Sequence, residues 1–142
     1  MKKLLKKPQS VFIILAVFMM VLGYYKQGAQ LDFSYFLSFL LVDVWSVALI
    51  SAVFFILISI NYASLSLAGK KPSRFLTITH VLLQVFALIP LVYYMIKSIP
   101  NQQTENLGQS NIILLFSFIV FIISVLLHLI NFFYSLTKQN NS

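Results

Sequence analysis

Two histidines inside long apolar runs are the side chains of this sequence that are best suited to chemistry. His80 lies about 9 Å along a helix from Arg74, and His128 about 12 Å from Leu136, at a helical rise of 1.5 Å per residue. Their runs are consecutive, so antiparallel neighbours would bring both imidazoles to a similar depth. Two neutral imidazoles on facing helices can hold haem iron or another metal. The alternative role is hydrogen bonding between helices, which we favour because no further convergent groups mark a reaction centre.

Other polar residues recur at helical spacing around these histidines. Polar positions follow steps of 7, 4, 3 and 4 in the last apolar run and of 3, 4 and 3 in the run before it, so each set shares one helical face. Lipid cannot satisfy polar groups, so these faces should form a seam where helices pack. A small-residue seam is expected on the second run. The polar face of the last run has Ser117, Ser124, His128, Asn131 and Ser135, and that of the third run has Thr77, His80, Gln84 and Ala87. The small-residue seam of the second run has Ala48, Ala52, Ser59 and Ala63.

Asp43 is the one carboxylate near membrane depth. If it were buried in the membrane, it would be costly and would suggest a proton or cation contact. At the outer end of a helix it would instead cap the N-terminus, where a negative charge suits the helix dipole. We favour the cap, because the nearby Trp45 is typical of the aromatic belt at a membrane surface.

The composition requires a lipid environment. Of the 142 residues, 60% are apolar and 9% charged, whereas soluble domains carry about 45–50% apolar and about 25% charged residues. The absence of cysteine excludes disulfides, thiolate metal sites and thiol redox chemistry. The sequence has no glycine-rich phosphate loop, paired carboxylates or serine–histidine–acid set, so we expect neither an enzyme nor a bound metal.

The apolar runs predict a single all-α domain over residues 1–142, an integral membrane four-helix bundle. One helix from Phe33 to Ala68 would be roughly 50 Å long, too long for a hydrocarbon core of about 30 Å. We therefore expect residues 33–41 to form a separate interfacial helix or an extra outer turn. A signal peptide is the alternative for the first run, but the flanking tyrosines favour a retained helix. Pro90 should kink the third helix. The predicted spans are 9–25, 43–68, 75–98 and 112–136.

The distribution of cations predicts the orientation. Eight of the ten Lys and Arg residues flank the apolar runs on one side and two on the other, and the richer side is normally cytoplasmic. Both termini are thus expected in the cytoplasm and the chain in a bacterial inner (plasma) membrane. The formal net charge of +7 does not indicate nucleic acid, since the cations lie at the ends of apolar runs. The side richer in cations has Lys2, Lys3, Lys6, Lys7, Lys70, Lys71, Arg74 and Lys138, and the other side has Lys26 and Lys97.

The start of the second span carries a resemblance to a known family. Leu31-Asp32, the stretch 42–47 and Thr77-Ile78-Thr79-His80 resemble a family of small bacterial membrane proteins, which in turn resemble a fragment of haem–copper oxidase subunit I. The family motif is His-Asp-Thr-Tyr-aromatic-Val at the outer start of a helix. Asp43 and Val47 match it, whereas Val42, Val44 and Trp45 replace the histidine, threonine and tyrosine. The resemblance covers about residues 1–96 and implies an inner-membrane protein near respiratory complexes, with no catalytic residue carried over.

Three functions follow as hypotheses. The leading one is a non-enzymatic accessory or structural subunit without a cofactor, which packs in the lipid bilayer against other membrane subunits or a second copy. The second is a redox bundle that binds haem b through His80 and His128. The third is a small transporter or channel component, with Pro90 as a hinge and Asp43, Gln84 and the histidines as a polar path.

Overall fold

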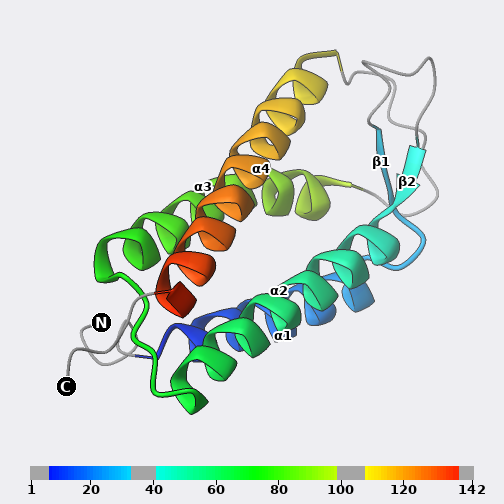
Figure 1. The fold of residues 1–142 in the computed structure, drawn as a ribbon. Coiled ribbons are helices and arrows are strands. Elements are labelled where there is room, and N and C mark those ends of the chain that lie inside the picture. The colour runs from blue at the N-terminus through cyan, green and yellow to red at the C-terminus, as the bar shows by residue number, and fades with distance from the viewer. Residues whose placement is uncertain (1–6, 33–40, 99–107, 138–142) are drawn as a thin grey trace.

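The computed structural model describes residues 7–32, 41–98 and 108–137 (Figure 1). Its elements are α1 (Pro8–Tyr25), β1 (Gln30–Asp32), β2 (Leu41–Asp43), α2 (Val44–Leu67), α3 (Arg74–Lys97) and α4 (Gly108–Thr137). All four helices are long and apolar enough to cross a membrane, which confirms the predicted all-α membrane bundle. Their ends lie within one residue of the predicted spans, except that α4 begins at Gly108 instead of 112.

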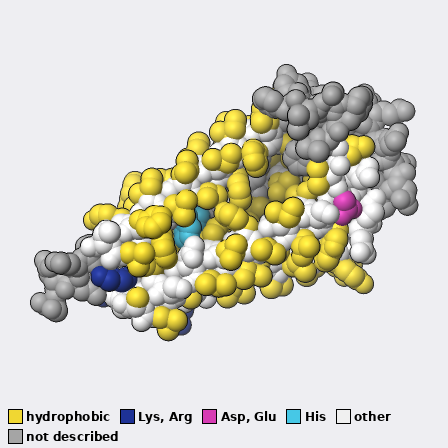
Figure 2. Space-filling view, turned by 45° about the vertical axis from the view of Figure 1, so that its right-hand side comes forward, with side chains coloured by type: hydrophobic (Ala, Val, Ile, Leu, Met, Phe, Trp, Pro, Cys, Tyr) yellow, Lys and Arg dark blue, Asp and Glu magenta, His cyan; other side chains and the backbone are white. Residues whose placement is uncertain are grey.

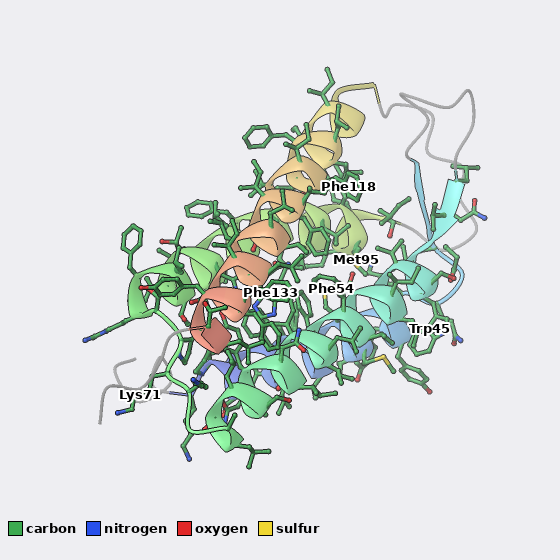
Figure 3. All side chains as sticks on the ribbon, viewed as in Figure 1. Trp45, Phe54, Lys71, Met95, Phe118 and Phe133 are labelled. Atoms are coloured by element: carbon green, nitrogen blue, oxygen red, sulfur yellow. The ribbon has the colours of Figure 1, made fainter. Side chains whose placement is uncertain are left out.

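The helices form two hairpins, α1 with α2 and α3 with α4 (Figure 1). Contacts are dense within each hairpin and far fewer between them, where they join α1 to α3 and α2 to α4. Phe54 points from α2 toward α4 (Figure 3), and its ring lies 4.9 Å from that of Phe121. The described helices therefore make two tight pairs that meet over a limited area.

Small residues allow α1 and α2 to approach closely. Ala48 and Ala52 of the predicted small-residue seam are buried, and a Cβ added at Gly23 would overlap Ala48 Cβ. The Ser59 hydroxyl donates to the carbonyl of Gln9 across the same contact, at 3.0 Å. The seam thus packs against α1, as small residues allow between helices in lipid.

A short antiparallel strand pair closes one end of this hairpin. Leu31 of β1 pairs with Val42 of β2, and Asp43 then begins α2 as its N-cap. Its carboxylate accepts from the Ser46 backbone N–H at 3.0 Å, as predicted for a helix cap. Residues 33–40 of the predicted interfacial segment lie outside the described residues, and Leu41 lies in β2 instead of a helix.

Pro90 lies inside α3, which continues through it from Arg74 to Lys97. Proline has no N–H, so the carbonyl of Phe86 lacks its usual partner in the helix. The Ser117 hydroxyl of α4 donates to the adjacent carbonyl of Ala87. A serine from a neighbouring helix thus binds backbone beside the proline, which is how proline is tolerated in membrane-spanning helices.

The outer surface is apolar along the helices and charged at the ends. The face in Figure 2 is covered by hydrophobic side chains, with Lys and Arg toward one end and an acidic side chain at the other. Four of the described cations, Lys7, Lys70, Lys71 and Arg74, lie where α1 begins and α2 connects to α3. Lys26 and Lys97 lie at the opposite end, as does Trp45 (Figure 3). This is the surface expected of a bundle that lipid surrounds.

Candidate functional site

The two histidines meet where the hairpins meet, together with two aromatic rings. The ring centroids of His80 and His128 are 4.8 Å apart, with their planes at 31°. Phe12 of α1 stacks on His80 at 5.0 Å, and Tyr62 of α2 lies 5.0 Å from His128. All four helices therefore contribute a ring to one buried cluster. We call this cluster the junction; its members are Phe12, Asn61, Tyr62, His80, Gln84, Ser124 and His128.

Each imidazole is hydrogen-bonded by one nitrogen to the other hairpin. The Tyr62 hydroxyl lies 3.0 Å from Nδ1 of His80. The Asn61 amide Nδ2 lies 3.2 Å from Nε2 of His128, and an amide nitrogen only donates, so this Nε2 accepts. These two bonds orient the rings and link α2 to both helices of the second hairpin.

Ser124 connects the two helices of the second hairpin beside the rings. Its hydroxyl lies 3.1 Å from the backbone carbonyl of His80 and 2.9 Å from Oε1 of Gln84. The hydroxyl has one proton and two acceptors here, so the carbonyl and the amide oxygen share it. The Gln84 side chain is thereby held one helical turn beyond His80.

Three buried side-chain atoms of the junction have no hydrogen-bond partner: His80 Nε2, Gln84 Nε2 and His128 Nδ1. His80 and Gln84 are 0% exposed and His128 is 3% exposed. An unpartnered buried donor or acceptor costs about 1–3 kcal/mol, so such atoms need an explanation. In the junction all three such atoms lie close together, on His80 and Gln84 one turn apart in α3 and on His128 in the neighbouring α4.

The other predicted seam residues are paired. Asn131 accepts from the Ser73 backbone N–H at 3.0 Å and donates to the Thr77 hydroxyl at 2.9 Å. Thr77 in turn donates to the Ser73 carbonyl at 2.9 Å, and Ser135 donates to the carbonyl of Asn131 at 2.6 Å. The bonds from Asn131 to Thr77 and from Ser117 to Ala87 join α4 to α3, as interhelical hydrogen bonds do in lipid, whereas Ser135 bonds within its own helix.

Asp43 is not part of the junction. It precedes Tyr62 by 19 positions, which is roughly 28 Å along α2. Asp43 therefore lies far from the histidines along α2, and the polar path of the transporter hypothesis stays a prediction. The structure brings His80, Gln84, Ser124 and His128 together and leaves Asp43 as the cap.

The junction contains three residues that sequence reasoning did not assign to it: Phe12, Asn61 and Tyr62. A signal existed for one of them. Tyr62 follows Ser59 by three positions and so shares the small-residue face of the second run. Asn61 carries a side-chain amide in the same run, but the spacing of residues along one helix does not show that this amide bonds His128.

The geometry of the rings does not fit haem. Two axial imidazoles on one iron have centres roughly 6 Å apart, since each metal–nitrogen bond is about 2 Å and the porphyrin lies between. The rings of His80 and His128 are closer, and Phe12 covers the other side of His80. Among the described residues, no group of three or more His, Cys, Asp or Glu is placed to hold a metal ion.

Comparisons with family models, with curated proteins and with solved structures find no match for this chain. The resemblance of residues 1–96 to small bacterial membrane proteins stays a prediction. Of the residues that carry it, Asp43 stands at the start of a helix, as the family motif has it.

Proposed function

We propose that this chain is a small multi-pass membrane protein, without enzymatic activity of its own, that binds a small molecule at the junction of its two hairpins. The observation that supports it is the contrast between paired and unpartnered groups. Asn131 and Thr77 satisfy one another, whereas His80, Gln84 and His128 each keep a buried atom without a partner. Polar groups that are costly inside a membrane and not needed for packing are typical of functional sites.

The same contrast separates a binding site from a packing device. A packing network is favourable when every member is satisfied, and a partly satisfied one is worse than apolar packing. The junction residues come from all four helices, so a bound molecule would contact both hairpins at once. Binding there would tie together two units that otherwise contact one another sparingly.

The accessory-subunit hypothesis becomes more specific in this form. The small-residue and polar seams that motivated it are occupied within the chain, by α1 against α2 and by α3 against α4. Other subunits or a second copy would therefore meet the apolar outer faces instead of these seams. Isolation from a native membrane in mild detergent tests this part, because a clean monomer without any partner would count against it.

The proposed location is a bacterial inner (plasma) membrane, with the end that carries Lys7, Lys70, Lys71 and Arg74 in the cytoplasm. The support is the excess of cations at that end, which normally stays on the cytoplasmic side. Since Pro8 and Thr137 both lie at this end, the two termini would share that compartment.

The binding role is tested by the stability of two matched variants of the purified protein. Gln84→Met removes an amide whose nitrogen has no partner, and the Ser124 hydroxyl that Oε1 shared then donates to the His80 carbonyl alone. We therefore expect a variant as stable as the parent or up to about 2 kcal/mol more stable. Asn131→Leu removes a fully paired amide and should cost about 1–3 kcal/mol. The measurement is reversible unfolding in mixed micelles, followed by circular dichroism.

The two variants distinguish a binding site from a packing network. A stable Gln84→Met variant means that glutamine is retained for something other than packing, as expected of a binding site. If Gln84→Met loses as much stability as Asn131→Leu, the junction is a packing network and the proposal fails.

A further inference from the structure

We propose that the ligand of the junction is a neutral, lipid-soluble molecule with a planar ring and a carbonyl oxygen, that is, a quinone-type headgroup that enters from the bilayer. This inference rests on the proposed function and names the class of molecule that the site takes. Four properties of the junction lead to it: unpartnered donors, a lack of charge, aromatic neighbours and a position beside the lipid-facing surface.

The unpartnered atoms call for a hydrogen-bond acceptor. Because Nε2 of His128 accepts from Asn61, its proton lies on Nδ1, which is unpartnered. Gln84 uses its oxygen toward Ser124, so its free group is the N–H of Nε2. Nε2 of His80 becomes a third donor when the Tyr62 hydroxyl donates to Nδ1. A ligand with carbonyl oxygens, which accept and do not donate, matches this set.

The junction lacks the charges that an ionic ligand needs. The described acidic residues, Asp32 and Asp43, belong to the strands at the far end of α2. The exposed Arg74 lies about 9 Å along α3 from His80. A buried ion without a counter-charge is strongly disfavoured in a low-dielectric site, so the ligand is neutral.

Aromatic rings surround the donors. Tyr62 lies 5.0 Å and Phe132 6.5 Å from the His128 ring, and Phe12 stacks on His80. These rings contact one another at the separations of about 4.5–7 Å that aromatic pairs favour, so a planar ligand ring would add to the edge of this stack. An aliphatic carbonyl compound would leave the stacking surface unused.

The junction lies beside the surface that faces lipid. Figure 2 shows histidine atoms on the outer surface among hydrophobic side chains, between the two ends of the bundle. Ile130 and Phe133 follow His128 on α4 by two and five positions, and each side chain is more than half exposed. A molecule that reaches an imidazole from this side comes through the hydrocarbon, which charged and strongly polar solutes do not enter.

The experiment measures binding of decylubiquinone to the purified full-length protein in mild detergent, with n-decylbenzene as the control that has a ring and tail but no carbonyl. We expect saturable binding of the quinone, a raised unfolding midpoint and a carbonyl stretch shifted to lower frequency by hydrogen bonding. Gln84→Met and His128→Leu should each weaken binding roughly tenfold, as loss of one good hydrogen bond predicts. Thr79→Ala is the matched control, because Thr79 bonds the Phe75 carbonyl on its own helix and should leave binding unchanged.

Each outcome supports or overturns the inference. Equal binding of decylbenzene, or an unshifted carbonyl stretch, would overturn it, because the donors would then play no part. If neither compound binds while Gln84→Met is as stable as the parent, the quinone class is wrong and the proposed binding role survives. If His128→Leu does not fold, the test uses Gln84→Met alone. A Gln84→Met variant that binds the quinone as tightly as the parent would also refute the inference.

Discussion

The close approach of α1 to α2 makes Gly23 sensitive to a single added methyl group. In Gly23→Ala the new Cβ would overlap Ala48 Cβ and lie 3.1 Å from Cε3 of Trp45. Carbon atoms pack at about 3.5–4.0 Å, so the helices must separate by roughly 1 Å at this point. The separation also loosens contacts of the buried Ala16 and Ala52 along the same seam.

The expected cost is moderate and can be estimated. Overpacking of a well-packed contact costs about 1–3 kcal/mol, and the better helix propensity of alanine returns about 1 kcal/mol. The overlap with Ala48 Cβ is severe, so we expect the upper part of that range, about 2–3 kcal/mol. The net loss is then about 1–2 kcal/mol, which is several degrees in the unfolding midpoint at about 2–4 °C per kcal/mol. The assay is reversible unfolding in mixed micelles, followed by circular dichroism.

Two further variants make this prediction specific. Val17→Ile adds a methyl group on the half-exposed outer face of α1 and should have no effect. Gly23→Ala combined with Ala48→Gly moves the methyl group to the other helix and should recover stability, less about 1 kcal/mol for the glycine now in α2. The reasoning is refuted if Gly23→Ala alone is as stable as the parent, or if Ala48→Gly gives no recovery.

Three more predictions concern the ends of the helices. Asp43→Ala removes the cap of α2 and should cost about 1 kcal/mol in the same assay, whereas Asp43→Asn should cost less, because asparagine also caps well. Lys26→Met removes two hydrogen bonds, at 2.6 and 3.1 Å, to carbonyls at the C-terminal end of α3 and should lower the unfolding free energy by about 1–2 kcal/mol; an unchanged value would mean that water replaces the ammonium group. The chain has no cysteine, so single substitutions report topology: a membrane-impermeant maleimide added outside intact cells should label Gln27→Cys and not Lys71→Cys, and the opposite result would reverse the proposed orientation.

The sequence predicted features that depend on one helix at a time. Four apolar runs gave four helices, and the cap at Asp43 followed from the polarity of a helix end. The spacing of Thr77, Gln84, Ser124 and Asn131 predicted buried faces, and all four side chains are buried. Such features are local, because helical periodicity and the length of the hydrocarbon core are known before any packing is.

The sequence did not predict how the helices pair or which polar groups remain unpartnered. In lipid, an apolar side chain costs little on either face of a helix, so the rotation of each helix is decided by the fit of its neighbours. The close approach at Gly23, the arrival of Asn61 and Tyr62 beside the histidines, and the stacking of Phe12 on His80 all depend on that fit.

Composition and periodicity alone thus determined that this chain forms four helices able to cross a membrane and turns its polar faces inward. Only the tertiary structure decided that the four helices form two hairpins and that three polar atoms at their junction have no partner. The physical reason is that a periodic pattern specifies which face of a helix is buried, whereas hydrogen-bond satisfaction depends on distances between residues far apart in the chain.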